Sequence, residues 1–264
     1  MTDLVALSVE RHSTKGWKNV TEYSFAAQET VIPIVSAEFH KVVPAMPIGF
    51  IEQEDGYRLV AVTSLIPEKN LYVSQDGRWL VPYIPATLRA YPFALVKLED
   101  PGKSTLCVNE RSGLVVDGKE GGHPFFENHG EPTQKIKGLI NFLSRLETNR
   151  TLTQTAVNAL ADAGVITSWE LTVNHGEETS PVNGLFRVDQ DGLNNLSGAD
   201  FLTLREAGGI LVAYAQVLSM NQLVVLERLH EIHNQVVTHE GKSPETSDLS
   251  DFSLSDVEGS LNFD

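Results

Sequence analysis

Two histidines and two glutamates fall within the short stretch GGHPFFENHGE, residues 121–131. Imidazole and carboxylate groups are ligands that divalent iron or zinc accepts, and a loop can bring them round one ion. The spacing matches no established metal-binding signature, and clusters without a signature often bind nothing. A polar loop without a metal is therefore the favoured interpretation, and no cofactor is expected. The alternative is a metal-dependent enzyme that holds Fe or Zn through His123, Glu127, His129 and Glu131.

A second candidate site is the stretch DGRWLVPYIPATLRAYPFAL, residues 76–95, which combines aromatic rings, prolines and arginines. The prolines fix the backbone and remove hydrogen-bond donors, while the rings and guanidinium groups can stack on a ligand or grip a carboxylate. The segment predicts either a binding groove or a corner that turns a sheet into the core. We favour the corner, because aromatic residues are more often buried than exposed. The candidate ligand-binding residues are Arg78, Trp79, Tyr83, Arg89 and Tyr91.

A third cluster lies in the stretch LERLHEIH, where Glu227, His230 and His233 recur at three-residue steps. Glu-x-x-His is half of a di-iron motif, but the chain contains no second copy, so an exposed helical face is favoured. The sequence contains no nucleophile elbow, phosphate-binding loop, dinucleotide fingerprint or His-Glu-x-x-His motif. No catalytic residues are therefore assigned, and binding is favoured over catalysis.

The charge of the chain limits its partners. Its 264 residues include 35 acidic and 20 basic side chains, a formal net charge of −15. This excess of acid argues against nucleic acid as a partner, because contacts to phosphate require Lys and Arg. The N-terminus has no apolar core of signal-peptide length, and the single cysteine, Cys107, cannot form an internal disulfide. These features predict a cytoplasmic protein.

The longest uncharged stretch, residues 207–226, has the length of a membrane-spanning helix. It nevertheless contains Gln216, Ser219, Asn221 and Gln222, which are costly in a bilayer. We therefore expect a buried helix and no membrane span.

The first half of the chain has the pattern of short antiparallel strands. Runs of β-branched and aromatic residues alternate with turn dipeptides such as Asp55-Gly56 and Asp76-Gly77. The expected strands are residues 30–35, 47–53, 57–65, 71–75, 93–99, 105–110 and 113–117.

The second half has a helical period. Apolar residues recur at steps of three and four from Ile136 to Leu146, which predicts a helix that ends at an ETNR turn, residues 147–150. Ser197 and Asp200 predict a helix cap. The expected fold is α+β, with an antiparallel β-rich N-terminal half packed against a helical C-terminal half. The later helices are expected at residues 153–163, 198–207 and 210–236, after strand-like stretches at 165–173 and 184–189.

The end of the chain, residues 239–264, interleaves acidic residues with single apolar residues. It is too poor in apolar side chains to offset the entropy of ordering, so we expect a disordered acidic tail after one globular domain at residues 1–238. A solvating tail is favoured over a segment that binds a partner.

Three blocks of the sequence resemble the SapC family in the same order. They are YSFAAQETVIPIVSAEFHKVVPAMPIGF, DGRWLVPYIPATLRAYPFAL and GLFRVDQDGLNNLSGADFLTLREAGGILVAYAQVLSMNQLVVLERL, which together extend over residues 23–229. The family, named for a protein of a bacterial surface-layer system, has no established activity and supplies no catalytic residues. Its gene neighbourhoods include TonB-dependent uptake receptors and halogenase-like proteins.

The resemblance implies a non-enzymatic binding or accessory protein linked to the bacterial envelope or to TonB-dependent uptake. Its expected partner is a protein or a small ligand, with no nucleic acid and no membrane span. Two alternatives remain open beside this cytoplasmic binding protein. One is the metal-dependent enzyme, and the other is a surface-layer component that reaches the cell surface through a signal in its C-terminal tail.

Overall fold

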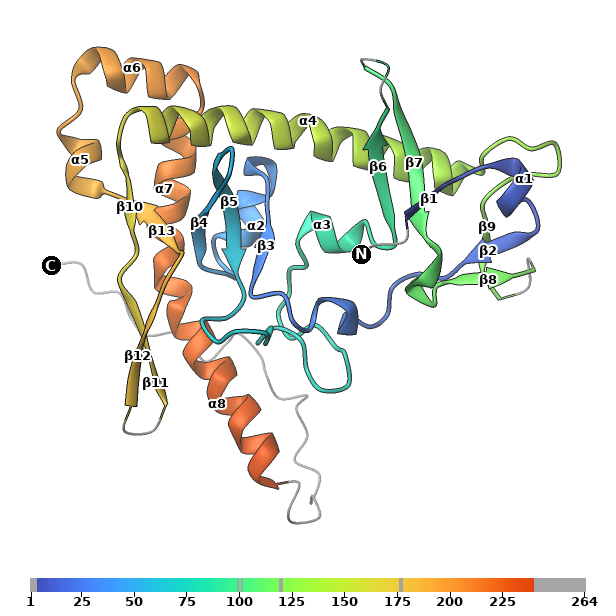
Figure 1. The fold of residues 1–264 in the computed structure, drawn as a ribbon, viewed down its shortest axis with the longest axis horizontal. Helices are drawn as coiled ribbons and strands as arrows, with labels where there is room; N and C mark the ends of the chain where they lie inside the picture. The colour runs from blue at the N-terminus through green and yellow to red at the C-terminus, as the bar shows by residue number, and fades with distance from the viewer. Residues whose placement is uncertain (1–3, 99, 101, 119–120, 176–177, 240–264) are drawn as a thin grey trace, which may run out of the picture.

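One long helix, α4 (Gln134–Asp162), connects the two halves of the molecule (Figure 1). The computed structural model describes residues 4–98, 100, 102–118, 121–175 and 178–239, so the predicted acidic tail beyond His239 lies outside the described residues. The second half of α4 packs into one hydrophobic cluster and its first half into another. Antiparallel sheets dominate the N-terminal part and helices follow, which confirms the predicted α+β class.

Helix α4 begins where the sequence predicts a helix and continues past the predicted end. The Thr133 hydroxyl accepts a 3.4 Å hydrogen bond from the Ile136 amide, which caps the first turn. The prediction of a turn at residues 147–150 is wrong, because the helix runs through this stretch. The stretch contains neither glycine nor proline, and the side chains of Thr148 and Asn149 donate to carbonyls one turn earlier. Since both flanks are packed, the helix stays continuous.

A five-stranded antiparallel sheet joins early and late segments of the chain. Its central hairpin turns at Asp55-Gly56 as predicted, and Gly56 has a φ of 113° that a larger residue would adopt only with strain. Pairing of Phe186 with Phe50 attaches a late strand to this early hairpin, so the order departs from a simple meander. Across the sheet the strands are β10 (Ile166–Ser168), β13 (Phe186–Val188), β4 (Ile48–Gln53), β5 (Gly56–Val62) and β3 (Val31–Pro33).

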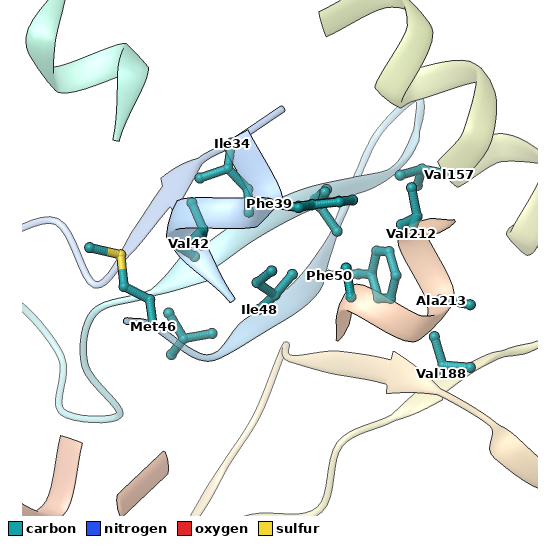
Figure 2. Close-up of a cluster of buried hydrophobic side chains, with 14 of the residues drawn as sticks. Ile34, Phe39, Val42, Met46, Ile48, Phe50, Val157, Val188, Val212 and Ala213 are labelled. Carbon is teal, nitrogen blue, oxygen red and sulfur yellow. The ribbon is translucent and has the colours of Figure 1, made fainter. Parts of the chain in front are cut away.

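The larger hydrophobic cluster lies where this sheet meets the helices (Figure 2). The helices that contribute to it include α2 (Phe39–Val42), α4, α6 (Gly198–Glu206) and α7 (Gly209–Ser219). Ile48 and Phe50 lie two residues apart on β4, so both point to the same side, and both are 0% exposed. A Cβ atom added at Gly209 would lie 2.2 Å from Cδ2 of Leu204, so a larger residue there would require the Leu204 side chain to move.

The smaller cluster packs a three-stranded sheet against the first half of α4. Phe93 and Val108 of this sheet meet Ile136 and Leu143 of the helix. Cys107 is buried on the same sheet, and burial raises the pKa of its thiol. The strands of this sheet are, in order, β1 (Leu4–Ala6), β7 (Ser104–Asn109) and β6 (Phe93–Lys97). Helix α1 (Val9–His12) follows β1 and leads into a second three-stranded sheet. Its strands are, in order, β8 (Val115–Asp117), β2 (Lys15–Trp17) and β9 (His123–Pro124).

The structure contradicts one further predicted strand and confirms one predicted helix. The strand expected at residues 71–75 is wrong, because this stretch forms only an isolated bridge between Val73 and Trp79. Helix α6 is confirmed, and the Ser197 hydroxyl accepts from the Asp200 amide as its predicted cap. The hairpin of β11 (Leu171–His175) and β12 (Glu178–Val182) and the short helix α5 (Gln190–Asn194) also precede α6.

The long C-terminal helix expected at residues 210–236 is interrupted. Helix α7 ends at Ser219, a 3₁₀ turn η4 (Met220–Gln222) follows, and α8 (Leu223–His239) continues the chain. The Ser219 hydroxyl donates to the Gln216 carbonyl and accepts from the Ile48 amide, so it links the end of α7 to β4. By length and composition Gly209–His233 could cross a membrane, and 39% of its most apolar window is buried in the fold.

Candidate functional site

The predicted corner segment is anchored to the body of the protein by one buried glutamate. Its short helix α3 (Ala86–Arg89) lies between the five-stranded sheet and β6, near the middle of α4 (Figure 1). Glu38 ends the 3₁₀ turn η2 (Ser36–Glu38) and is 5% exposed. Its Oε1 accepts from the Val35 amide at 2.8 Å, and its Oε2 accepts from the Ala86 amide at 2.8 Å and the Tyr83 hydroxyl at 2.6 Å. Both carboxylate oxygens are therefore satisfied by neutral donors.

Two of the five predicted ligand-binding residues make their contacts within or beside the segment itself. Trp79 is half-buried, stacks on Tyr72 and donates from its indole nitrogen to the Tyr83 carbonyl at 2.8 Å. Arg78 is exposed and pairs with Asp76 across the turn at 2.7 Å. The favoured corner interpretation fits these two residues.

The other three predicted residues line two hollows on opposite sides of α3. The first, which we call the basic pocket, has a volume of about 330 Å³ and lies between α2, α3 and the middle of α4. Arg89 lies at its mouth, where its Nε donates to the Ile84 carbonyl at 3.1 Å. The guanidinium carbon lies 5.7 Å from the centre of the Tyr83 ring and 5.3 Å from that of Phe142, so two rings hold it in place. The pocket is lined by Val35, Ala37, Glu38, His40, Lys41, Tyr83, Ala86, Arg89, Phe142, Arg145, Leu146 and Asn149.

The charges of the basic pocket are not balanced within the described part of the chain. Lys41, Arg89 and Arg145 are exposed, and none of them forms an ion pair with a described carboxylate. Glu38 is the acidic residue of the lining, and its oxygens are already occupied. Burial and the hydrogen bond to Glu38 raise the pKa of the Tyr83 hydroxyl, which therefore stays a protonated donor.

The second hollow, which we call the apolar groove, has a volume of about 480 Å³. Tyr91 stacks on Phe25 of η1 (Ser24–Ala26) at its side, with ring centres 3.8 Å apart and planes inclined by 8°. The groove runs between β3, the edge of the five-stranded sheet, and β6, the edge of the three-stranded sheet. Its lining is Leu4, Phe25, Ala26, Glu29, Val31, Ile32, Pro33, Thr87, Leu88, Tyr91, Pro92, Phe93, Ala94 and Asn109.

The four predicted metal ligands are spread along β9, which contains His123, and the loop that leads from it to α4. His123 packs edge-on against Trp17, and the Lys135 ammonium lies 2.9 Å from both of its ring nitrogens. Glu127 and His129 are exposed, and Glu131 lies 3.9 Å from the Lys137 ammonium. In the part of the chain that the structure describes, no three His, Cys, Asp or Glu residues are grouped so as to hold a metal ion. The geometry therefore lends the metal alternative no support.

A charged cluster that the sequence did not predict surrounds Glu110, and we call it the Glu110 cluster. The carboxylate of Glu110 accepts from Arg11 Nε at 2.9 Å and pairs with the Lys15 ammonium at 3.3 Å. Nε2 of fully buried His12 lies 3.2 Å from the same carboxylate. The hydrogen bond from Arg11 and the charge of Lys15 lower the pKa of Glu110 to about 2, and burial lowers that of His12.

These residues lie almost a hundred positions apart in sequence, so no local pattern connects them. The cluster fastens α1 to η3 (Glu110–Ser112) and is packed by Phe125 against His12. Its cations are fully engaged, so we assign it a role in stability.

Comparison with known proteins places the chain in a family. No curated protein and no solved structure matches it. The model of the SapC family matches residues 7–226, a span that includes the basic pocket, the Glu110 cluster and all of the apolar groove except Leu4. The chain therefore belongs to the SapC family.

Proposed function

We propose that this SapC-family protein is a non-enzymatic binding protein whose main recognition surface is the apolar groove. The observation that carries the proposal is the stacked pair of Phe25 and Tyr91 beside a concave surface with few polar groups. Phe25 is 36% exposed, which is high for a large aromatic side chain that a monomer could bury. Exposed aromatic surface beside an apolar hollow is typical of sites that anchor a partner.

The expected occupant is an extended segment of a partner protein. Both β3 and β6 are edge strands among the described sheets, and edge strands offer backbone groups to an added chain. On β3, Pro33 has no N–H and its carbonyl accepts from the Thr87 hydroxyl at 2.9 Å, so β6 is the more open edge. The apolar side chains of the groove would then accept alternate side chains of that segment. Among the polar lining residues, the Thr87 hydroxyl already donates to the Pro33 carbonyl and Asn109 Oδ1 already accepts from the Arg111 amide, so Glu29 supplies the exposed carboxylate of the groove.

The proposed setting follows from the family and from the composition. It is a cytoplasmic accessory role beside the bacterial envelope or TonB-dependent uptake systems, as the SapC resemblance implies. Neither alternative gains a supporting observation. The metal-dependent enzyme lacks a gathered ligand set among the described residues, and export through the tail depends on residues outside them.

The test is quantitative capture of partners from the native source with purified wild-type protein and two variants. Phe25→Ala removes a ring from the groove, and Phe201→Ala removes a similarly exposed ring, 39% exposed, from α6 on another part of the molecule. We expect a specific protein that binds wild type and Phe201→Ala but is lost from Phe25→Ala. That protein, once purified, should show the same pattern of binding. Equal capture by all three proteins would refute the groove as the recognition surface.

A further inference from the structure

The basic pocket has an electrostatic character opposite to that of the whole chain. The protein carries 35 acidic and 20 basic residues, so a cation on its surface has many potential partners. Several described cations pair with one, as Arg11, Arg58, Arg78 and Arg150 do, whereas scattered surface cations such as Lys69, Lys97 and Arg205 do not. Lys41, Arg89 and Arg145 instead line one hollow without any described carboxylate paired to them. Three neighbouring cations repel one another unless an anion lies between them.

The one carboxylate of the lining does not neutralise these cations. Glu38 receives three hydrogen bonds from the Val35 and Ala86 amides and the Tyr83 hydroxyl. It is buried at the base of α3, whereas the three cations are exposed at the surface. The Tyr83 hydroxyl that donates to Glu38 also accepts from Arg89 Nη2 at 3.5 Å, so Glu38 fixes the shape of the pocket without a direct ion pair to any of the three cations.

The pocket also holds one guanidinium group in a defined orientation. Arg89 is fixed through its Nε by the Ile84 carbonyl and lies over the rings of Tyr83 and Phe142. A guanidinium whose position is already set loses little entropy when it binds an anion. Arg145 lies on α4 three residues after Phe142 and therefore lines the same pocket from the facing helix.

The remaining lining is apolar and suits the body of a small organic molecule. Phe142, Leu146 and Val35 supply aromatic and aliphatic surface beside the guanidinium groups. The volume of about 330 Å³ is in the range of pockets that take small ligands. An organic anion fills this apolar lining better than inorganic phosphate does, so an organic ligand is favoured.

We propose that the basic pocket is a binding site for a small organic carboxylate with a planar apolar body. The carboxylate lies between Arg89 and Arg145, with Lys41 as a further cation, and the body packs on Phe142 and Leu146. Planar guanidinium groups match the two oxygens of a carboxylate, which the rounder ammonium group of lysine does not. The site is separate from the apolar groove, so it extends the proposed function rather than depending on it.

The experiment titrates purified full-length protein with benzoate and follows backbone amide shifts by NMR. The comparison ligands are benzamide, a neutral molecule of the same shape, and inorganic phosphate. Benzoate should shift amides near Lys41, Arg89 and Arg145 at concentrations below ~10 mM, an affinity range typical of a small fragment. Benzamide should shift them far less, and phosphate should bind more weakly than benzoate.

Two matched variants on the same helix test the charge requirement. Arg145→Gln removes a cation from the pocket, and Arg150→Gln removes one that pairs with Glu147 instead. Both lower the net charge by one unit, so a general electrostatic effect would weaken benzoate equally in both. We expect about a tenfold loss for Arg145→Gln and less than about a twofold change for Arg150→Gln. Circular dichroism checks that both variants are folded.

Several results would overturn the proposal. They are an absence of benzoate shifts, equal binding of benzamide, tighter binding of phosphate, or equal losses in the two arginine variants. The Phe25→Ala variant distinguishes this site from the apolar groove. It should keep full benzoate affinity even if it loses its protein partner.

Discussion

The basic pocket and the Glu110 cluster both place cations near a glutamate, yet they distribute hydrogen bonds in opposite ways. In the Glu110 cluster, Arg11 and Lys15 pair directly with the carboxylate. In the basic pocket, Glu38 is satisfied by two amides and a hydroxyl, and the surrounding cations stay unpaired.

The difference separates a structural role from a binding role. A cation that is paired inside the protein stabilises the fold, whereas one left unpaired in a hollow adds no stability to it. Stability measurements can therefore test the comparison without knowledge of the ligand.

The largest loss of stability is expected for Glu38→Ala. The change leaves the Val35 amide, the Ala86 amide and the Tyr83 hydroxyl without their acceptor. Because buried donors to a charged acceptor are costly to leave unpaired, we expect the free energy of unfolding to fall by about 3 kcal/mol or more. Urea denaturation measures it. The Glu38→Gln variant keeps an acceptor oxygen and should lose less, and a loss below about 1 kcal/mol for Glu38→Ala would contradict the anchoring role.

A smaller loss is expected for Glu110→Gln. The Glu110 side chain is 18% exposed, and it pairs with Arg11 and Lys15. Removal of its charge should lower the free energy of unfolding by about 1 to 2 kcal/mol. The control is Glu147→Gln, which breaks the exposed pair with Arg150 and should cost no more than about 0.5 kcal/mol. Equal effects of the two changes would show that the Glu110 cluster is an ordinary surface pair.

Acid should weaken the Glu110 cluster in a defined pH window. The folded state lowers the pKa of Glu110 from 4.5 to about 2, so its stabilising contribution is present above pH 4.5 and lost as the pH falls toward 2. Burial lowers the pKa of His12 below 6.5, so the unfolded chain takes up a proton first and stability also begins to fall below that pH. Urea midpoints measured across this range should decline in wild type. In Glu110→Gln the decline between pH 4.5 and 2 should be shallower, and an unchanged slope would disprove the linkage.

The sequence predicted local features of the fold well, because their signals are local. The helical period from Ile136, the cap at Ser197 and the turn at Gly56 each involve residues a few positions apart. The continuity of α4 through residues 147–150 was missed, because it depends on the packing of both flanks against separate clusters.

Local sequence patterns indicated only those residues of the candidate site that lie within one short segment. The aromatic and arginine content of residues 76–95 pointed to Tyr83, Arg89 and Tyr91, and these residues do line hollows. Glu38 lies 45 residues before Tyr83, and Arg145 comes from a helix whose period indicated only its buried face. Nothing in the local sequence indicates that these groups meet, so the distribution of charge around α3 required the structure.

The smallest effect on stability, and the sharpest contrast between the two regions, is expected from two arginine variants. Arg11→Gln removes a two-point hydrogen bond to Glu110 and should lower the free energy of unfolding by about 1 kcal/mol. Arg145→Gln removes a cation that has no described carboxylate partner and stands near Arg89 and Lys41. Its loss relieves repulsion, so the free energy of unfolding should stay within about 0.5 kcal/mol of wild type or rise slightly.

The sign of the change decides between the two interpretations of the basic pocket. Urea denaturation at low ionic strength gives the most sensitive measurement, because salt screens repulsion between exposed charges. If Arg145→Gln destabilises the protein as much as Arg11→Gln does, Arg145 has a structural partner and the pocket is part of the scaffold. If Arg145→Gln leaves the free energy of unfolding unchanged while benzoate affinity falls, Arg145 acts in ligand binding and adds no stability to the fold.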